Sequence, residues 1–180
     1  MWAKINRYYP PWLDLIGLLL FSTAFSYIRA HYDQIPTTVP THFGLAGHPD
    51  AWSAKSIWTV YGPLLIGLGV FLSIALLNIF LIIRPENPAK ILNIPQRDKD
   101  LLGPERLEAI RTFTVRGLAA INLTLAVLFA YLGYASANVA MGLMPGLGAL
   151  MWVFTAVLLG GSLYLTVKTL LMSSARGISR

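Results

Sequence analysis

Four long apolar stretches limit what this chain can fold into. They cover residues 12–29, 57–83, 112–134 and 147–172. An α-helix rises about 1.5 Å per residue, so each stretch could cross a hydrocarbon layer about 30 Å thick. Only 12% of the residues are charged, which is about half the fraction usual in a soluble domain. The sequence therefore predicts an all-α integral membrane protein with four transmembrane helices.

The positions of the basic residues predict how these helices are oriented. A net charge of +6 could indicate nucleic-acid binding, but Lys and Arg sit at the ends of the apolar stretches instead of forming one basic domain. Of the 14, only Arg29 and Lys55 flank the loop between the first two helices. Cytoplasmic segments of membrane proteins are enriched in Lys and Arg, so both termini are predicted to be cytoplasmic. We expect contact with the lipid bilayer and no nucleic-acid partner.

This orientation divides the chain into three parts. Residues 1–83 hold the first two helices and an extracytoplasmic loop at 32–55, residues 84–111 form a cytoplasmic connector, and residues 112–180 form a helical hairpin with a C-terminal tail. Ser56 is a candidate N-cap of the second helix, which Pro85 ends. A helix beginning at Pro104 is predicted to continue into the third span, and residues 135–146 are predicted to form a turn.

Polar and small residues within the spans predict helix packing. Asn78 and Asn122 are expected to form hydrogen bonds between helices. Glycines at 67, 69, 160 and 161 permit close helix approach. Asp14 and Arg116 lie just inside their spans near the same membrane face, where a carboxylate can pair with a cation. A structural ion pair of Asp14 with Arg116, or with Lys168, is predicted over a proton relay.

The loop at residues 35–55 is a polar island that contains two of the three histidines. Its three prolines and two glycines favour a fixed, turn-rich shape over a strand or a helix. Residues 40–43 are predicted to be extended, with one turn at 44–47 and a second at 47–50. Thr41, His42, His48, Asp50 and Lys55 could converge there, with Phe43 and Trp52 as apolar anchors against the helix ends.

The loop also carries a family resemblance. Its pattern of Ile35-Pro36, Val39-Pro40-Thr41-His42-Phe43, Gly47, Pro49-Asp50, Trp52 and Lys55 resembles the bacterial domain of unknown function that forms the N-terminal part of SdpI-type immunity and signalling membrane proteins. The resemblance covers about residues 12–63, and members often have asparagine where this chain has Gly44. The glycine, arginine, threonine, proline and tryptophan signature of the C-terminal half in SdpI-type proteins is not visible after Arg84.

The resemblance therefore implies a similar loop and first two helices, and not immunity itself. It implies a multi-pass protein of the bacterial inner (plasma) membrane, of a kind not known to be an enzyme. The external loop would meet a peptide toxin, a signal or another membrane subunit. The predicted partner-binding residues are His42, Phe43, His48, Asp50, Trp52 and Lys55.

Catalytic and metal chemistry find less support in the sequence. His42, His48 and Asp50, joined by His31 or Asp33, are residue types that bind zinc, but the His-x5-His-x-Asp spacing matches no well-known zinc signature. His42 is predicted to bond loop backbone and His48 to face water. Cysteine is absent, and the chain contains neither a GxSxG elbow nor a phosphate-binding loop. We expect no metal, no cofactor and no enzymatic activity.

Three functional hypotheses remain open. The first is a non-catalytic membrane protein whose extracytoplasmic loop binds a protein or peptide partner. The second is an accessory subunit that docks its loop and apolar helix faces onto a larger membrane complex. The third, placed last, is a metal-dependent membrane enzyme or transporter that uses the His and Asp residues of the loop.

Overall fold

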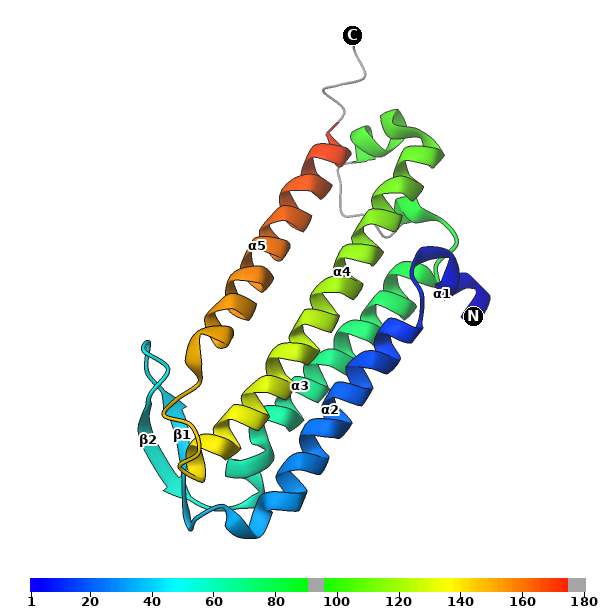
Figure 1. Ribbon diagram of the computed structural model, residues 1–180. Helices are drawn as coiled ribbons and strands as arrows, with labels where there is room; N and C mark the ends of the chain where they lie inside the picture. The colour runs from blue at the N-terminus through cyan, green and yellow to red at the C-terminus, as the bar shows by residue number, and fades with distance from the viewer. Residues whose placement is uncertain (91–95, 175–180) are drawn as a thin grey trace.

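Four long helices form the body of the protein. The computed structural model describes residues 1–90 and 96–174. The helices are α2 (Trp12–His31), α3 (Ile57–Leu77), α4 (Gln96–Ala140) and α5 (Gly148–Ser173), and they run along the long axis of the molecule (Figure 1). Four helical segments, at 12–34, 57–83, 101–140 and 148–173, are long and apolar enough to cross a membrane. The predicted number of membrane-length helices is confirmed.

The central helix is α4, against which α2, α3 and α5 all pack. Figure 1 shows α5 on one side of α4 and the other two helices on the opposite side. Phe21 of α2 and Phe71 of α3 are buried together, with ring centroids 5.7 Å apart. Gly67 of α3 brings α3 and α4 together, because any added Cβ would overlap Phe129. The core therefore lies among α2, α3 and α4, and α5 is peripheral.

Two buried asparagines join α3 to α4 as predicted. Asn78 Nδ2 donates to the carbonyl oxygen of Val115 at 3.2 Å, and Asn122 Nδ2 donates to that of Phe71 at 3.2 Å. Among the other predicted contacts, Gly69 and the pair Gly160–Gly161 face open space and bring no helices together. Each asparagine thus forms a hydrogen bond to the backbone of the neighbouring helix, within the bundle.

The two ends of α3 follow from its sequence. Ser56 forms the predicted N-cap, in a capping box with Thr59. At its other end the helix widens into a π-helix, Asn78–Ile83, where the N–H of Arg84 donates to the carbonyl oxygen of Ile79 at 2.8 Å. Helical backbone stops before Pro85, as predicted.

α4 confirms one prediction and corrects another. The helix continues from Pro104 into the third span, and its one non-helical residue is Gly103 (φ +69°). The predicted turn is wrong at 135–140, because α4 extends to Ala140. Ala135, Ala137 and Val139 are buried on this last part of the helix, so packing overrides its weakly polar sequence. The turn before α5 is correspondingly shorter.

The all-α prediction is wrong in the loop between α2 and α3. After a short 3-10 turn (Tyr32–Gln34), strands β1 (Thr38–Phe43) and β2 (Pro49–Ala54) form an antiparallel sheet with Pro40 opposite Trp52. Val39 is 3% exposed and belongs to the main core. Burial of this β-branched residue against α3 and α4 favours a strand over the irregular loop that the prolines predicted.

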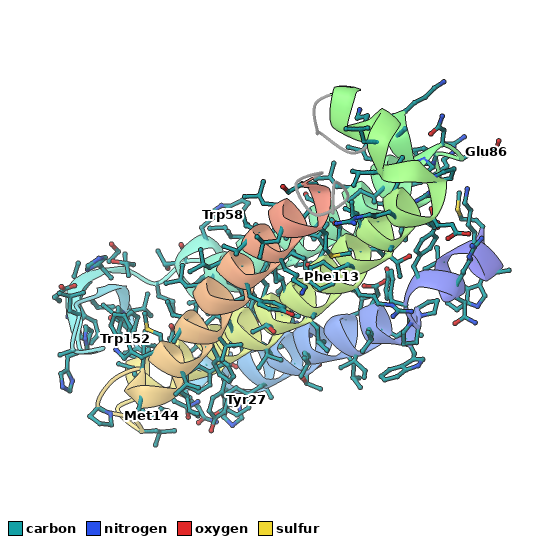
Figure 2. All side chains as sticks on the ribbon, turned by 90° about the horizontal axis from the view of Figure 1, so that it is seen from above. Tyr27, Trp58, Glu86, Phe113, Met144 and Trp152 are labelled. Carbon is teal, nitrogen blue, oxygen red and sulfur yellow. The ribbon has the colours of Figure 1, made fainter. Side chains whose placement is uncertain are left out.

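The molecule has two distinct ends. The short helices α1 (Trp2–Tyr8) and η3 (Pro88–Lys90) lie at one end together with the end of α5, which we call the termini end (Figure 1). The two strands and the α4–α5 loop lie at the other, the hairpin end. Glu86 and Met144 mark these opposite ends in Figure 2. The predicted placement of the N-terminal tail and the loop on opposite sides of the helices is consistent with this arrangement.

Candidate partner-binding hairpin

The two strands are joined by a tight turn that contains the predicted first turn. The N–H of Gly44 donates to the carbonyl oxygen of His48 at 2.9 Å, and the N–H of Gly47 donates to that of Gly44 at 2.8 Å. Gly47 has φ +76°, which glycine adopts without strain. Leu45 at the tip is 88% exposed. The predicted second turn at 47–50 is wrong, because β2 already begins at Pro49.

The turn is docked on the α4–α5 loop. The N–H of Leu147 donates to the carbonyl oxygen of Gly47 at 2.9 Å. Gly146 has no side chain at the point of contact, where a Cβ would overlap the Gly47 carbonyl. His48 Nδ1 lies 2.9 Å from the carbonyl oxygen of Pro145, so this nitrogen carries the proton and donates. His48 is exposed, but the prediction that it only faces water is wrong.

Lys55 braces the base of the hairpin. Its ammonium donates to the carbonyl oxygens of Tyr32 at 2.6 Å and Ile35 at 2.8 Å, and lies 4.2 Å from the centre of the Tyr32 ring. The half-buried side chain thereby joins the end of β2 to the segment that leaves α2. This geometry gives Lys55 a structural role, and its predicted role in partner binding stays a prediction.

His42 and Asp50 meet on the exposed side of the hairpin. His42 Nδ1 and Asp50 Oδ1 are 2.5 Å apart, and the side chains are 69% and 52% exposed. The prediction that His42 bonds loop backbone is therefore wrong. Asp50 Oδ2 would be 3.0 Å from a Cβ on Gly44, so glycine leaves room for the carboxylate. The pair links the two strands beside their turn.

Trp52 and Phe43 differ in their surroundings. Trp52 is 49% exposed, so it is not the predicted anchor against the helix ends. Phe43 is half-buried at the end of β1, opposite Pro49. Every residue of β2 after Pro49 is exposed. The exposed strand β2, with Trp52 and the adjoining His42–Asp50 pair, forms what we call the β2 surface.

These residues do not form a cluster with the number of ligands that a metal site needs. Among the side chains that the structure describes, those of residues 1–90, 99 and 101–174, no group of three or more His, Cys, Asp or Glu could hold a metal ion. His42 and Asp50 converge, whereas His48 is bonded to Pro145 and His31 to the carbonyl oxygen of Tyr27 at 2.8 Å. Structural zinc usually has four protein ligands. The chemistry that this arrangement offers is hydrogen bonding at an exposed surface.

The predicted ion pair of Asp14 is not formed. Asp14 Oδ2 accepts a 2.7 Å hydrogen bond from the Tyr9 hydroxyl, and Arg116 Nε donates to the carbonyl oxygen of Tyr8 at 2.8 Å. Neither Arg116 nor Lys168 forms a salt bridge to Asp14. Tyr8 and Tyr9, at the end of α1, supply the hydrogen-bond partners of Arg116 and Asp14 instead. Burial, followed by the hydrogen bond to Asp14, raises the pKa of Tyr9, which keeps its hydroxyl protonated as the donor.

A buried arginine at the termini end was not predicted as a site. Arg111 is 2% exposed, and its Nη2 donates to the carbonyl oxygens of Ile83 and, at 2.7 Å, of Pro85. Its guanidinium lies 5.1 Å from the ring of Tyr8, whose hydroxyl donates to Glu108 Oε1 at 2.6 Å. Burial and this hydrogen bond raise the pKa of Tyr8.

Arg111 thereby satisfies carbonyls that the π-helix and the following proline leave unpaired. It joins the end of α3, the connector, α1 and α4 in one cluster. The signal available in the sequence was the spacing of Glu108 and Arg111, three residues apart on a predicted helix. By sequence alone, Arg111 is only one of the basic residues that predict the orientation of the helices.

Comparison with known proteins agrees with the loop resemblance. Residues 17–68 match a family described as "Domain of unknown function (DUF1648)". The match covers most of α2, the whole hairpin and about the first half of α3. No curated protein and no solved structure matches the chain. The family match includes the β2 surface, and α4 and α5 lie outside it.

Proposed function

We propose that this chain is a non-catalytic multi-pass membrane protein whose extracytoplasmic hairpin binds a protein or peptide partner. The observation that carries the proposal is the exposed strand β2. Its only strand partner within the described sheet is β1, which lies between it and the helices. The other edge of β2 is therefore open to a second chain.

An open strand edge offers a known mode of recognition. An extended peptide can pair its backbone N–H and C=O groups with those of the edge, while pockets or anchors beside the strand select its side chains. Trp52 supplies a large apolar group, of a type enriched among residues that dominate binding energy. His42 and Asp50 supply donors and an acceptor next to it. The β2 surface thus combines backbone pairing with side-chain selection.

The hairpin is also held in a fixed position. Hydrogen bonds join Gly47 to Leu147 and His48 to Pro145, and Lys55 ties the base of β2 to the backbone after α2. Ordering a loop during binding opposes association by roughly 0.5–1.5 kcal/mol for each immobilised flexible side chain. A docked hairpin avoids part of that loss, which supports a role as a recognition surface.

The distribution of charge supports one orientation in the membrane. The excess of Lys and Arg at the termini end supports a cytoplasmic position for that end and an extracytoplasmic position for the hairpin. The resemblance to SdpI-type proteins, in the bacterial inner membrane, favours a peptide toxin, a signal or a membrane subunit as the partner. The family match covers the hairpin that would make this contact.

Photocrosslinking from the hairpin in living cells tests the proposal. A photoreactive amino acid at Trp52 should give one discrete adduct, and the adduct should be lost when Asp50→Lys is added. The same amino acid at Leu163, an exposed residue on the outer face of α5, serves as the control. Equal adducts from both positions, or no adduct from Trp52 when the chain is correctly inserted, would contradict partner binding by β2.

The second candidate function, an accessory subunit of a larger membrane complex, is favoured by α5. This helix packs mainly on α4, and of its residues only Ser173 is buried. Its exposed side chains include Leu159, Leu163 and Leu171. This apolar face could pack against the helices of a neighbouring subunit in place of lipid.

The size of the extracted particle separates the two functions. Native mass spectrometry after mild-detergent extraction should give a large, stoichiometric complex if the chain is an accessory subunit. Recovery of the free chain alone would exclude that function and leave the first proposal in place.

A further inference from the structure

We propose that a groove between α1 and α4 at the termini end binds the headgroup of an anionic phospholipid. The groove has a volume of about 380 Å³ and is lined by residues before and at the start of α2 and by one face of α4. Two arginines, Arg7 and Arg116, are among the residues that line it, together with Asn6. This α1–α4 groove is separate from the hairpin, and its role does not depend on the proposed function.

The two arginines carry positive charge that the described residues do not neutralise. Arg116 Nε donates to the carbonyl oxygen of Tyr8 at 2.8 Å, which fixes the guanidinium at the groove. Its terminal nitrogens form no hydrogen bond or ion pair with any side chain that the structure describes, which means residues 1–90, 99 and 101–174, and the same holds for the side chain of Arg7. Guanidinium groups bind phosphate oxygens in pairs of hydrogen bonds, so two free groups favour a phosphate ligand.

The nearby carboxylates have other partners. Asp14 accepts the hydroxyl of Tyr9, and Glu108 accepts the hydroxyl of Tyr8 and faces Arg111 at 3.5 Å. Neither carboxylate lines the groove. An anion that entered would therefore meet the arginines without a competing carboxylate on the groove wall.

The rest of the lining favours a lipid over a soluble anion. Leu13 of α2 and Ala119, Ala120 and Leu123 of α4 form an apolar wall beside the two arginines. Leu13 lies in the segment 12–34 and the other three in 101–140, both of which are long and apolar enough to span a membrane. A phosphate at the arginines would thus place its acyl chains along α2 and α4. A soluble phosphate would gain nothing from this wall.

The charge pattern also places the groove where anionic lipids occur. The termini end is predicted to be cytoplasmic, and the cytoplasmic leaflet carries much of the negative surface charge of a membrane. Trp12, 55% exposed at the start of α2, is of the type enriched at the membrane interface. The two arginines, the apolar wall and the predicted cytoplasmic position therefore all favour a phospholipid with a net negative headgroup, such as phosphatidylglycerol.

Native mass spectrometry of the full chain in detergent tests this site. Purified protein is mixed with equal amounts of phosphatidylglycerol or phosphatidylcholine, and the lipid-bound fractions are compared. We expect phosphatidylglycerol to be retained preferentially and its affinity to fall roughly tenfold in the double variant Arg7→Gln/Arg116→Gln. The double variant Lys90→Gln/Lys168→Gln removes the same charge from exposed positions outside the groove and should stay within about twofold of the original chain.

A second variant fills the groove without changing the charge. Ala120→Trp places a large side chain on the exposed apolar wall and should also abolish the preference for phosphatidylglycerol. Unchanged retention in the Arg7→Gln/Arg116→Gln variant would overturn the proposal, and so would equal losses in the two double variants. An equal rise in melting temperature with inorganic phosphate and with phosphatidylglycerol would show a simple anion site and would also overturn it.

Discussion

Arg111 shows how one side chain can hold several elements at the termini end. It is 2% exposed, and its donors reach the carbonyls of Ile83 and Pro85, which helical hydrogen bonds do not satisfy. A buried carbonyl that loses its partner destabilises a protein by about 1–3 kcal/mol. The side chain therefore acts as an internal cap for the π-helix at the end of α3.

We predict that Arg111→Met destabilises the protein by about 2–4 kcal/mol, because two buried carbonyls lose their donor while the apolar stem remains. Lys90→Met, at an exposed position of the same connector, should change the free energy of unfolding by less than about 0.5 kcal/mol. Tryptophan fluorescence during detergent-induced unfolding of the purified chain measures both. Equal losses in the two variants would show that Arg111 has no special role.

The pair of His42 and Asp50 should behave differently, because both side chains are more than half exposed. Exposed ion pairs usually contribute less than about 1 kcal/mol to stability. We therefore expect His42→Ala and Asp50→Asn each to lower the free energy of unfolding by less than about 1 kcal/mol, as measured by the same detergent titration with Ser53→Ala as the control. A loss above about 2 kcal/mol would mean that the pair maintains the hairpin instead of serving recognition.

The hydrogen-bond partners of charged side chains were harder to predict than those of buried amides. Asp14 was expected to pair with a distant cation, but a hydroxyl five residues away reaches it, because the chain before α2 folds back against α4. The asparagines at 78 and 122 were predicted correctly, since a buried amide within an apolar helix must find a partner on a neighbouring helix. A charged group near the membrane face has more choices, and sequence spacing does not decide among them.

Packing of α3 on α4 includes a close approach at Gly67, and Gly133 of α4 makes another against Leu64 of α3. Any Cβ at Gly67 would overlap Phe129, whereas nothing lies within 4 Å of a Cβ at Gly69. Both positions lie within the same helix, so a change from glycine to alanine alters helix propensity by a similar amount at each. A difference in stability between the two variants therefore measures the effect of packing.

Gly67→Ala should lower the free energy of unfolding by about 1–3 kcal/mol, since the added methyl group forces α3 and α4 apart. Gly69→Ala should cause no loss, because alanine favours a helix over glycine by up to about 1 kcal/mol. Thermal unfolding in detergent compares the two variants. Equal melting temperatures would contradict the close approach.

The elements of the fold were predictable to different degrees. The long helices follow from their apolar length, and the start of α3 follows from Ser56. The extended backbone at 40–43 was predicted correctly and lies in β1. The pairing of two strands was not predicted, because three prolines and two glycines in residues 35–55 favour turns locally, and contacts that fix the hairpin come from far along the chain. Gly47, for example, receives its hydrogen bond from Leu147. Local sequence could not supply that contact.

At the scale of the whole molecule, the hairpin depends on helices outside the matched family segment. The match ends at residue 68, yet the hairpin packs on α4 and on the loop before α5. In this chain α4 and α5 thus complete a platform whose exposed surface lies in the matched segment. A partner that binds β2 would meet a surface positioned by the entire bundle.

Cysteine labelling in cells tests directly whether β2 is an external, partner-covered surface. The natural chain contains no cysteine, so Ser53→Cys on β2 and Leu143→Cys on the α4–α5 loop can each be read alone. Ser53 and Leu143 are both exposed at the hairpin end. Labelling uses a membrane-impermeant maleimide on intact cells, and the rates are compared with those of the purified protein.

We predict rapid labelling of Leu143→Cys in intact cells and in the purified protein. Ser53→Cys should react much more slowly in cells than after purification, because the bound partner covers β2. If Leu143→Cys reacted only after the membrane was permeabilised, the predicted orientation would be wrong. If Ser53→Cys reacted as fast in cells as in the purified protein, no partner would cover β2, and the proposed function would be contradicted.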